Sequence, residues 1–153
     1  MGAPCYIFKV ELMDFEDIWR RIGMRANQTL DDFHEAIYLA FDRDEEHLYS
    51  FYFPRRAFDG RPSRSNSVEY AHPYAAEDDL ALFRQRPCNA AKVKLGALEL
   101  RPGRVFYYLF DYGDSWWHKI TVESINAPAP KGKPPWILQR HGDSPPEYPV
   151  FDE

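Results

Sequence analysis

One histidine and two aspartates lie close together around a predicted β-hairpin turn, and they are the first residues to consider for chemistry. Residues 105–125 read VFYYLFDYGDSWWHKITVESI, in which a Gly- and Asp-containing break separates two arms of aromatic and branched residues. This pattern predicts an antiparallel hairpin with a turn longer than two residues. Asp111 and Asp114 in the turn, with His118 in the second arm, are suited to metal binding or proton transfer. The same residues are also typical of an Asx-stabilised turn beside a hydrogen-bonded core histidine.

The second arm of the hairpin alternates in the way expected of a half-buried strand. One row should face the core, and it consists of Trp116, His118, Ile120 and Val122. The opposite row is more polar, so the hairpin is predicted to cover the core with one face.

Upstream patterns predict the elements that position this hairpin. Strands are expected at residues 5–13, 18–25 and 47–53, where apolar and aromatic residues dominate. A helix is expected at residues 29–41, because Thr29 is a good N-cap and apolar residues recur at helical spacing. A shorter helix is expected at residues 75–86, and the acidic run at residues 42–46 is expected to be a solvated loop.

The order of these elements predicts an α+β domain. We expect a mixed β-sheet of about five strands, β-β-α-β followed by a C-terminal hairpin, in a β-grasp-like arrangement with one main helix packed on one face. Residues 1–153 are long enough for a single domain. Within it, residues 54–73 are expected to form a mobile Arg-rich loop, and residues 126–153 an extended Pro-rich tail.

Composition and charge exclude several classes of protein. The net charge of −5 provides no protein-wide positive field for nucleic acid, and the 16% aromatic content argues against a disordered chain. Cys5 and Cys88 form no CxxC pair, which indicates neither a zinc ribbon nor a disulfide framework. The chain contains no nucleotide-binding glycine loop, HExxH or GxSxG motif. We expect a cytoplasmic protein with no membrane partner, because no apolar run reaches membrane-spanning length.

Two groups of residues are candidates for binding. A groove beside the turn is expected to be lined by aromatic side chains, namely Trp19, Tyr112, Trp116 and Trp117. Nucleic-acid phosphate or a protein partner is expected to contact the arginines of the predicted loop, namely Arg55, Arg56, Arg61 and Arg64. A solvated loop without a ligand is the alternative for these arginines.

The segment LFDYGDSWWHKITVESI resembles the plasmid pRiA4b ORF-3-like family, whose members carry an aromatic-Asp-(Phe/Tyr)-Gly-Asp hallmark followed by Trp and a β-strand. The resemblance covers roughly residues 5–125. It also rests on KVEL at residues 9–12, IWRRI at 18–22, TL at 29–30 with FH at 33–34, AF at 40–41 and HL at 47–48.

The resemblance implies an uncharacterised protein, since family members carry labels such as insertion-element passenger or TnpR-like. A serine recombinase needs a nucleophilic serine among catalytic arginines, and this chain does not support that label. We expect a non-enzymatic binding or accessory module associated with plasmids or mobile elements, without a cofactor, that contacts protein or nucleic acid. The alternative is a small metal-dependent hydrolase that uses Asp111, Asp114 and His118, with His34 as a further candidate. A third interpretation makes the turn purely structural.

Overall fold

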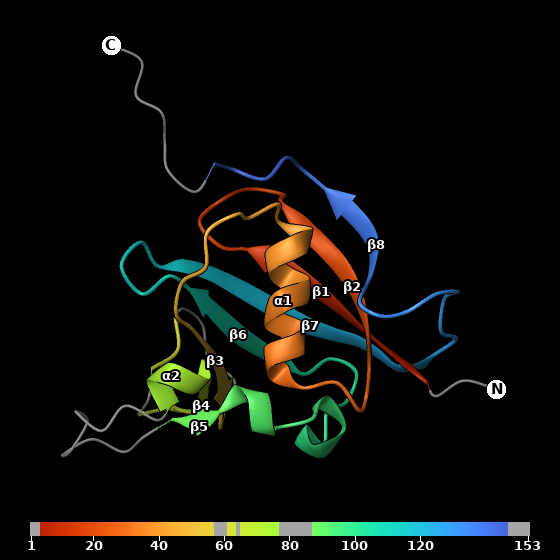
Figure 1. Cartoon of the computed structure of the whole chain (residues 1–153), viewed down its shortest axis with the longest axis horizontal. Helices are drawn as coiled ribbons and strands as arrows, with labels where there is room; N and C mark the ends of the chain where they lie inside the picture. The colour runs from red at the N-terminus through yellow and green to blue at the C-terminus, as the bar shows by residue number, and fades with distance from the viewer. Residues whose placement is uncertain (1–3, 57–60, 64, 77–86, 147–153) are drawn as a thin grey trace, which may run out of the picture.

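An eight-stranded sheet organises the chain. The computed structural model describes residues 4–56, 61–63, 65–76 and 87–146. The strands follow the order β5-β4-β3-β6-β7-β1-β2-β8, and neighbours are antiparallel except β4 and β5 (Figure 1). Their bounds are β1 (Cys5–Leu12), β2 (Trp19–Arg25), β3 (Tyr49–Pro54), β4 (Ser67–Ala71), β5 (Cys88–Asn89), β6 (Val105–Phe110), β7 (Trp116–Ala127) and β8 (Trp136–His141).

The expected α+β domain with about five strands in a β-grasp-like arrangement is wrong. The structure is mostly sheet, with β4 and β5 added at one edge and β8 at the other. β4 lies inside residues 54–73 and β8 inside residues 126–153, where proline, glycine and polar residues obscure the alternation that marks a strand. β8 pairs with β2, more than a hundred residues earlier in the chain, and local patterns do not reveal that pairing.

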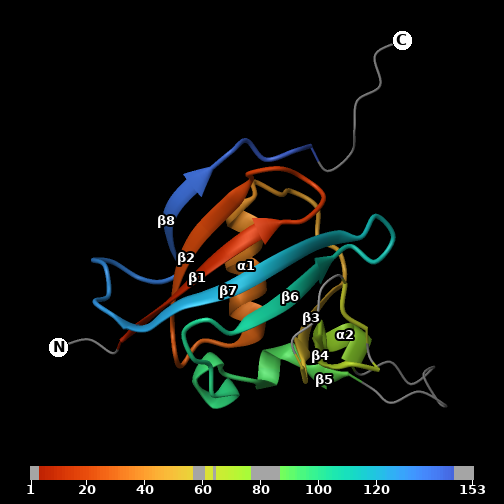
Figure 2. The ribbon, with the colours of Figure 1, turned by 180° about the vertical axis from the view of Figure 1, so that it is seen from behind.

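Helix α1 (Leu30–Ala40) packs on one face of the sheet (Figure 1). A capping box begins it: Thr29 Oγ1 accepts from the Asp32 backbone N–H at 3.1 Å, and Asp32 Oδ2 accepts from the Thr29 N–H at 2.9 Å. Its buried side includes Leu30, Phe33 and Ile37. Seen from behind, no helix of the described residues crosses β1, β2 or β7 (Figure 2), so α1 covers one face of the sheet.

The main core lies between α1 and the sheet, and it is built from aromatic rings. Phe106 of β6 stacks on Phe53 with ring centroids 4.3 Å apart, and Phe8 packs against Phe33 of α1 at 4.5 Å. Buried aromatic side chains of this size each contribute about 1.5–3 kcal/mol through burial. The predicted inward row of β7 is confirmed for His118, Ile120 and Val122, which are all buried.

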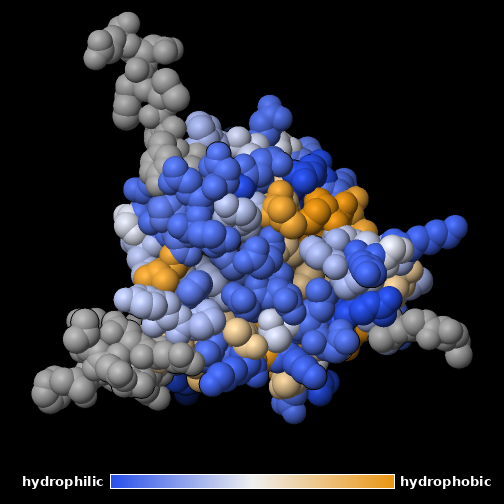
Figure 3. All heavy atoms as spheres, in the orientation of Figure 1, coloured by the Kyte–Doolittle hydropathy of each residue, from blue (hydrophilic) through white to orange (hydrophobic). Residues whose placement is uncertain are grey.

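Short helices complete the described residues: α2 (Pro73–Ala76), η1 (Ala90–Lys92) and η2 (Leu95–Leu98). Most of the helix expected at residues 75–86 lies outside the described residues. No helix in the described part of the chain is long and apolar enough to cross a membrane. Figure 3 shows that the surface between α1 and α2 is largely hydrophilic, whereas a hydrophobic patch lies near the C-terminal end of α1 and β8.

Candidate metal centre

The structure places His118 in the core, away from the turn aspartates. Its Nε2 lies 2.7 Å from Nη2 of Arg43. Because a guanidinium only donates, Nε2 accepts, and Nδ1 therefore carries the proton donated to the Tyr108 carbonyl oxygen at 3.2 Å. Burial, followed by the positive charge of Arg43, lowers the pKa of His118 well below its usual value. His118 is thus a neutral histidine that ties β6 and β7 to the loop after α1.

The turn between β6 and β7 is held by hydrogen bonds of its own. Asp111 has a left-handed φ of 63°. Its Oδ1 accepts from the Gly113 and Asp114 N–H groups at 3.1 and 3.4 Å, and its carbonyl accepts from the Ser115 N–H at 2.7 Å. Within the described residues, no hydrogen bond or ion pair joins His118 to Asp111 or Asp114. The structure therefore does not bring these three candidates together.

The aromatic candidates lie in different surroundings. Tyr112 turns back to β3, where its hydroxyl donates to a carbonyl oxygen at 2.9 Å. Trp19 stacks on a histidine ring of β8 at 5.1 Å. Trp117 belongs to a small apolar cluster with Tyr52, whereas Trp116 packs against the main core. The groove expected beside the turn stays a prediction.

The arginines that were predicted to bind a partner also lie in different surroundings. Arg55 and Arg56 are exposed at the end of β3. Arg61 forms an ion pair with Asp14, which ties its segment to the turn between β1 and β2. Arg64 lies outside the described residues.

A pocket elsewhere on the molecule brings together several titratable side chains that the sequence did not indicate as neighbours. It has a volume of about 490 Å³ and lies between α1, the loop after α1 and the start of α2. Its lining consists of Asp31, His34, Glu35, Glu46, His47, Leu48, His72 and Pro73.

His34 is the buried member of this pocket. Only 1% of it is exposed, and its ring stacks on Tyr49 at 3.9 Å. Its Nδ1 lies 2.6 Å from the Tyr108 hydroxyl, so the ring orientation is fixed from the core side. Burial, followed by the nearby charges of His72 and Arg43, lowers the pKa of His34 to about 3. The imidazole is therefore neutral near pH 7.

The other ring nitrogen of His34 faces two carboxylates. Nε2 lies 3.3 Å from Glu46 Oε2 and 3.9 Å from Glu35 Oε1. One ligand atom from each of these residues lies within 4.8 Å of the other two. Burial, then the charges of Glu46 and Asp31, raise the pKa of Glu35. A cation placed among the three would relieve this crowding of negative charge.

Two further groups define the pocket wall. Asp31 accepts from the Tyr49 hydroxyl at 2.5 Å, which fixes that carboxylate against β3. His72 Nδ1 accepts from the Tyr74 backbone N–H at 3.0 Å, so the proton of neutral His72 is on Nε2. His72 can therefore donate a hydrogen bond, whereas Asp31 can only accept one.

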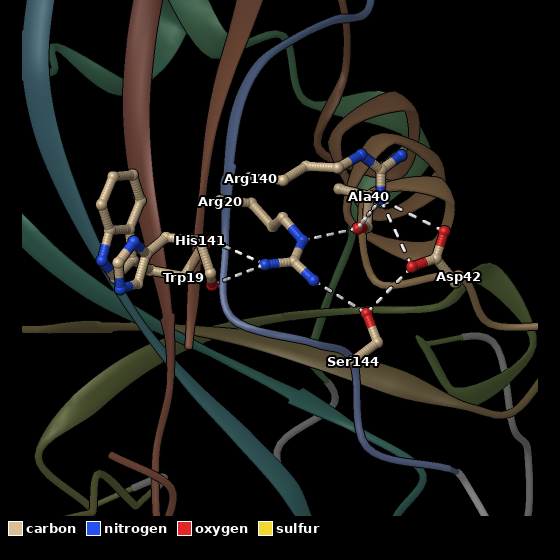
Figure 4. A network of polar contacts seen from close by, with 7 residues as sticks. All are labelled: Trp19, Arg20, Ala40, Asp42, Arg140, His141 and Ser144. Atoms are coloured by element: carbon tan, nitrogen blue, oxygen red, sulfur yellow. Dashed lines mark hydrogen bonds and ion pairs between the residues drawn. The ribbon is translucent and has the colours of Figure 1, made fainter. Parts of the chain in front are cut away.

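The loop that carries Glu46 is anchored at its start by two arginines from other elements. Arg20 of β2 and Arg140 of β8 both donate to the carbonyl oxygen of Ala40 (Figure 4). The two distances are 2.8 and 2.7 Å. Cationic donors at a helix C-terminus satisfy free carbonyls and complement the helix dipole. Arg140 and Ser144 also bind Asp42, the second residue beyond α1. Together with the contact between Arg43 and His118, these bonds fix the path of the loop toward Glu46.

Comparisons with known proteins identify relatives in sequence and in structure. Residues 4–148 match the family described as plasmid pRiA4b ORF-3-like protein. The uncharacterized protein y4hQ of Sinorhizobium fredii (strain NBRC 101917 / NGR234) is 30% identical over 149 residues, which are 96% of this chain and 67% of that protein. The crystal structure of MM3350, a protein of unknown function from Methanosarcina mazei Go1, has a TM-score of 0.71 at 24% identity. That match covers 96% of this chain and 74% of the other, and it shows the fold alone. The resemblance found in the hairpin is thus confirmed, and the chain belongs to the plasmid pRiA4b ORF-3-like family.

Proposed function

We propose that the protein is a metal-binding module that holds a divalent cation through His34, Glu35 and Glu46. The observation that carries this proposal is the convergence of one buried imidazole nitrogen and two carboxylates in one pocket. It differs from the expectation of a protein without a cofactor, and it moves the candidate metal from the turn to α1.

The distances support a site that needs little rearrangement. Two ligand atoms at about 2.0–2.2 Å from a tetrahedral zinc ion lie about 3.3–3.6 Å apart. The separations from His34 Nε2 are 3.3 Å to Glu46 and 3.9 Å to Glu35. Bringing Glu35 to ligand distance from the buried His34 therefore asks its exposed side chain to move by a few tenths of an ångström, and all three ligand atoms already lie within 4.8 Å of one another.

The protonation state of His34 also supports the proposal. A histidine binds metal only as neutral imidazole, and protons compete with the metal wherever its pKa lies near the ambient pH. With a pKa of about 3, His34 is already neutral near pH 7, so protons do not compete with the metal for it. In the structure, neutral His34 donates from Nε2 to the Glu46 carboxylate, and its Nδ1 accepts from the Tyr108 hydroxyl. A metal on Nε2 requires the other tautomer, in which Nδ1 donates to the same hydroxyl.

The mixed nitrogen and oxygen ligands favour Zn²⁺, Mn²⁺ or Fe²⁺ over Ca²⁺, which prefers six to eight oxygen ligands. Isothermal titration of EDTA-treated protein with Zn²⁺ and Mn²⁺ tests the proposal, and we expect one ion per chain. Ca²⁺ should bind more weakly than either.

Glu46→Gln provides the informative variant, because it removes one ligand charge with almost no change in shape. We expect a loss of affinity at least as large as the 10–100-fold typical of residues that only support ligands. Glu45→Gln is the matched control, since Glu45 is adjacent and equally exposed, at 57% against 56%, but lies outside the three-residue cluster. Equal losses in both variants, or no binding in the parent protein, would contradict the proposal.

A second candidate function is metal-assisted hydrolysis. Three protein ligands leave open coordination positions, and a bound water can reach a pKa near 7 on zinc. His72 lines the same pocket and carries its proton on Nε2, from which it can donate to an oxygen of a substrate. Hydrolysis of p-nitrophenyl esters or phosphates that requires Zn²⁺ or Mn²⁺ and disappears in Glu46→Gln would favour this function over binding alone.

An accessory role on plasmids or mobile elements stays a prediction. The family description refers to a plasmid reading frame, and this supports the prediction only by association.

A further inference from the structure

A second depression, separate from the metal pocket, lies on the sheet near the ends of β3 and β4. It has a volume of about 430 Å³. Its lining includes the aliphatic side chains of Val68, Leu98 and Leu100, which we call the groove floor. None of its lining residues belongs to the metal pocket. We call this feature the arginine groove.

Among the described residues, three exposed arginines border the groove, against one carboxylate from Glu99. Arg55 follows β3, while Arg101 and Arg104 come from the turn before β6. This local excess of positive charge contrasts with the net charge of −5 for the whole chain. A cationic border on an otherwise acidic protein selects a partner that is negatively charged at this place.

The turn that carries two of these arginines is rigidly attached to the sheet. Gly103, at φ 93°, donates its N–H to the Val122 carbonyl at 2.8 Å, and Val122 donates back to the Arg104 carbonyl at 2.9 Å. The Arg104 guanidinium also donates to the Pro54 carbonyl at 2.9 Å. The groove is therefore formed before any partner arrives, which reduces the entropy lost on binding.

The side chains of the groove floor favour an acidic peptide over single-stranded nucleic acid as the anionic partner. Single-stranded nucleic acid binds by stacking bases on open aromatic faces. Here Phe53 already stacks on Phe106 at 4.3 Å, and the Tyr70 ring meets Phe53 edge-on at 5.4 Å. The remaining floor is aliphatic, which suits an aliphatic side chain of a peptide.

We propose that the arginine groove docks an acidic peptide segment of a partner protein, with an aliphatic side chain on the groove floor and flanking carboxylates on Arg55 and Arg101. This interaction does not depend on the metal pocket, because the two sites share no residue.

Fluorescence anisotropy with the full chain tests this inference. The probe is a fluorescein-labelled peptide in which glutamates flank a central leucine. Comparison probes are the same peptide with lysines in place of glutamates, the peptide with serine in place of leucine, and a labelled oligothymidylate. We expect the glutamate–leucine peptide to bind more tightly than each of them, with an affinity that falls as salt is raised.

Charge reversal in the groove supplies the matched comparison. Arg101→Glu should weaken the glutamate–leucine peptide by about tenfold or more, because it replaces an attraction with a repulsion. Arg56→Glu makes the same charge change at an exposed arginine that does not line the groove, and it should have a much smaller effect. Equal effects of the two variants, tighter binding of the oligothymidylate, or no binding of the glutamate–leucine peptide would overturn the inference.

Discussion

Removal of one buried hydroxyl group should weaken metal binding without touching a ligand. Tyr108→Phe keeps the aromatic ring, which packs against Phe51 at 4.8 Å, but deletes the oxygen 2.6 Å from His34 Nδ1. When Nε2 of His34 binds a metal, Nδ1 must carry the proton and would then have no acceptor. Loss of such a supporting hydrogen bond typically reduces affinity 10–100-fold, or about 1.4–2.8 kcal/mol. The same loss should lower the free energy of unfolding by about 1–3 kcal/mol.

Isothermal titration with Zn²⁺ measures the change in affinity, and urea denaturation of the metal-free protein measures the change in stability. Tyr52→Phe is the control, because that buried hydroxyl donates to Glu69 at 3.3 Å on the other face of the sheet. It should alter stability but leave the zinc affinity unchanged. If Tyr108→Phe loses stability yet binds zinc as tightly as the parent protein, the reasoning about His34 is wrong.

Two further predictions concern stability. Because the pKa of His34 is depressed from 6.5 to about 3, the unfolded chain binds more protons between these values, and stability should fall as the pH falls below about 6.5. His118 acts in the same direction. Urea midpoints measured across this range should fall less steeply in His34→Asn; an unchanged slope would contradict the assignment. In the hairpin turn, Asp111→Ala should cost about 1 kcal/mol, since its carboxylate accepts two backbone hydrogen bonds, whereas Asp114→Ala should cost much less. Thermal unfolding measures both, and a larger loss for Asp114 would contradict this account of the turn.

The local elements of the fold were predictable because their signals lie within a few residues of one another. The capping box at Thr29 and the alternation around the turn identify α1 and the hairpin. The edges of the sheet were not predictable in this way. β5 has only two residues, and β8 is recognised by its pairing with β2, more than a hundred residues earlier. The size of the sheet therefore depended on one very short strand and on one pairing between segments that are distant in sequence.

The candidate site shows the same limit. His34 follows Leu30 by four residues on the apolar stripe of α1, which is the pattern of an ordinary core histidine. Glu46 belongs to an acidic run that is expected to be a solvated loop. Their meeting depends on Arg43, which turns into the core, and on Arg20, which anchors the end of α1. The sequence signal that was available is the high density of His and acidic residues at 31–35 and 44–47.

Anomalous X-ray diffraction from crystals grown with Zn²⁺ or Mn²⁺ tests the central claim most directly, because it locates the ion. The proposed site predicts one strong anomalous peak about 2.0–2.2 Å from His34 Nε2 and from carboxylate oxygens of Glu35 and Glu46. A peak beside Asp111 and Asp114, or no peak at His34 in crystals that contain the metal, would contradict it.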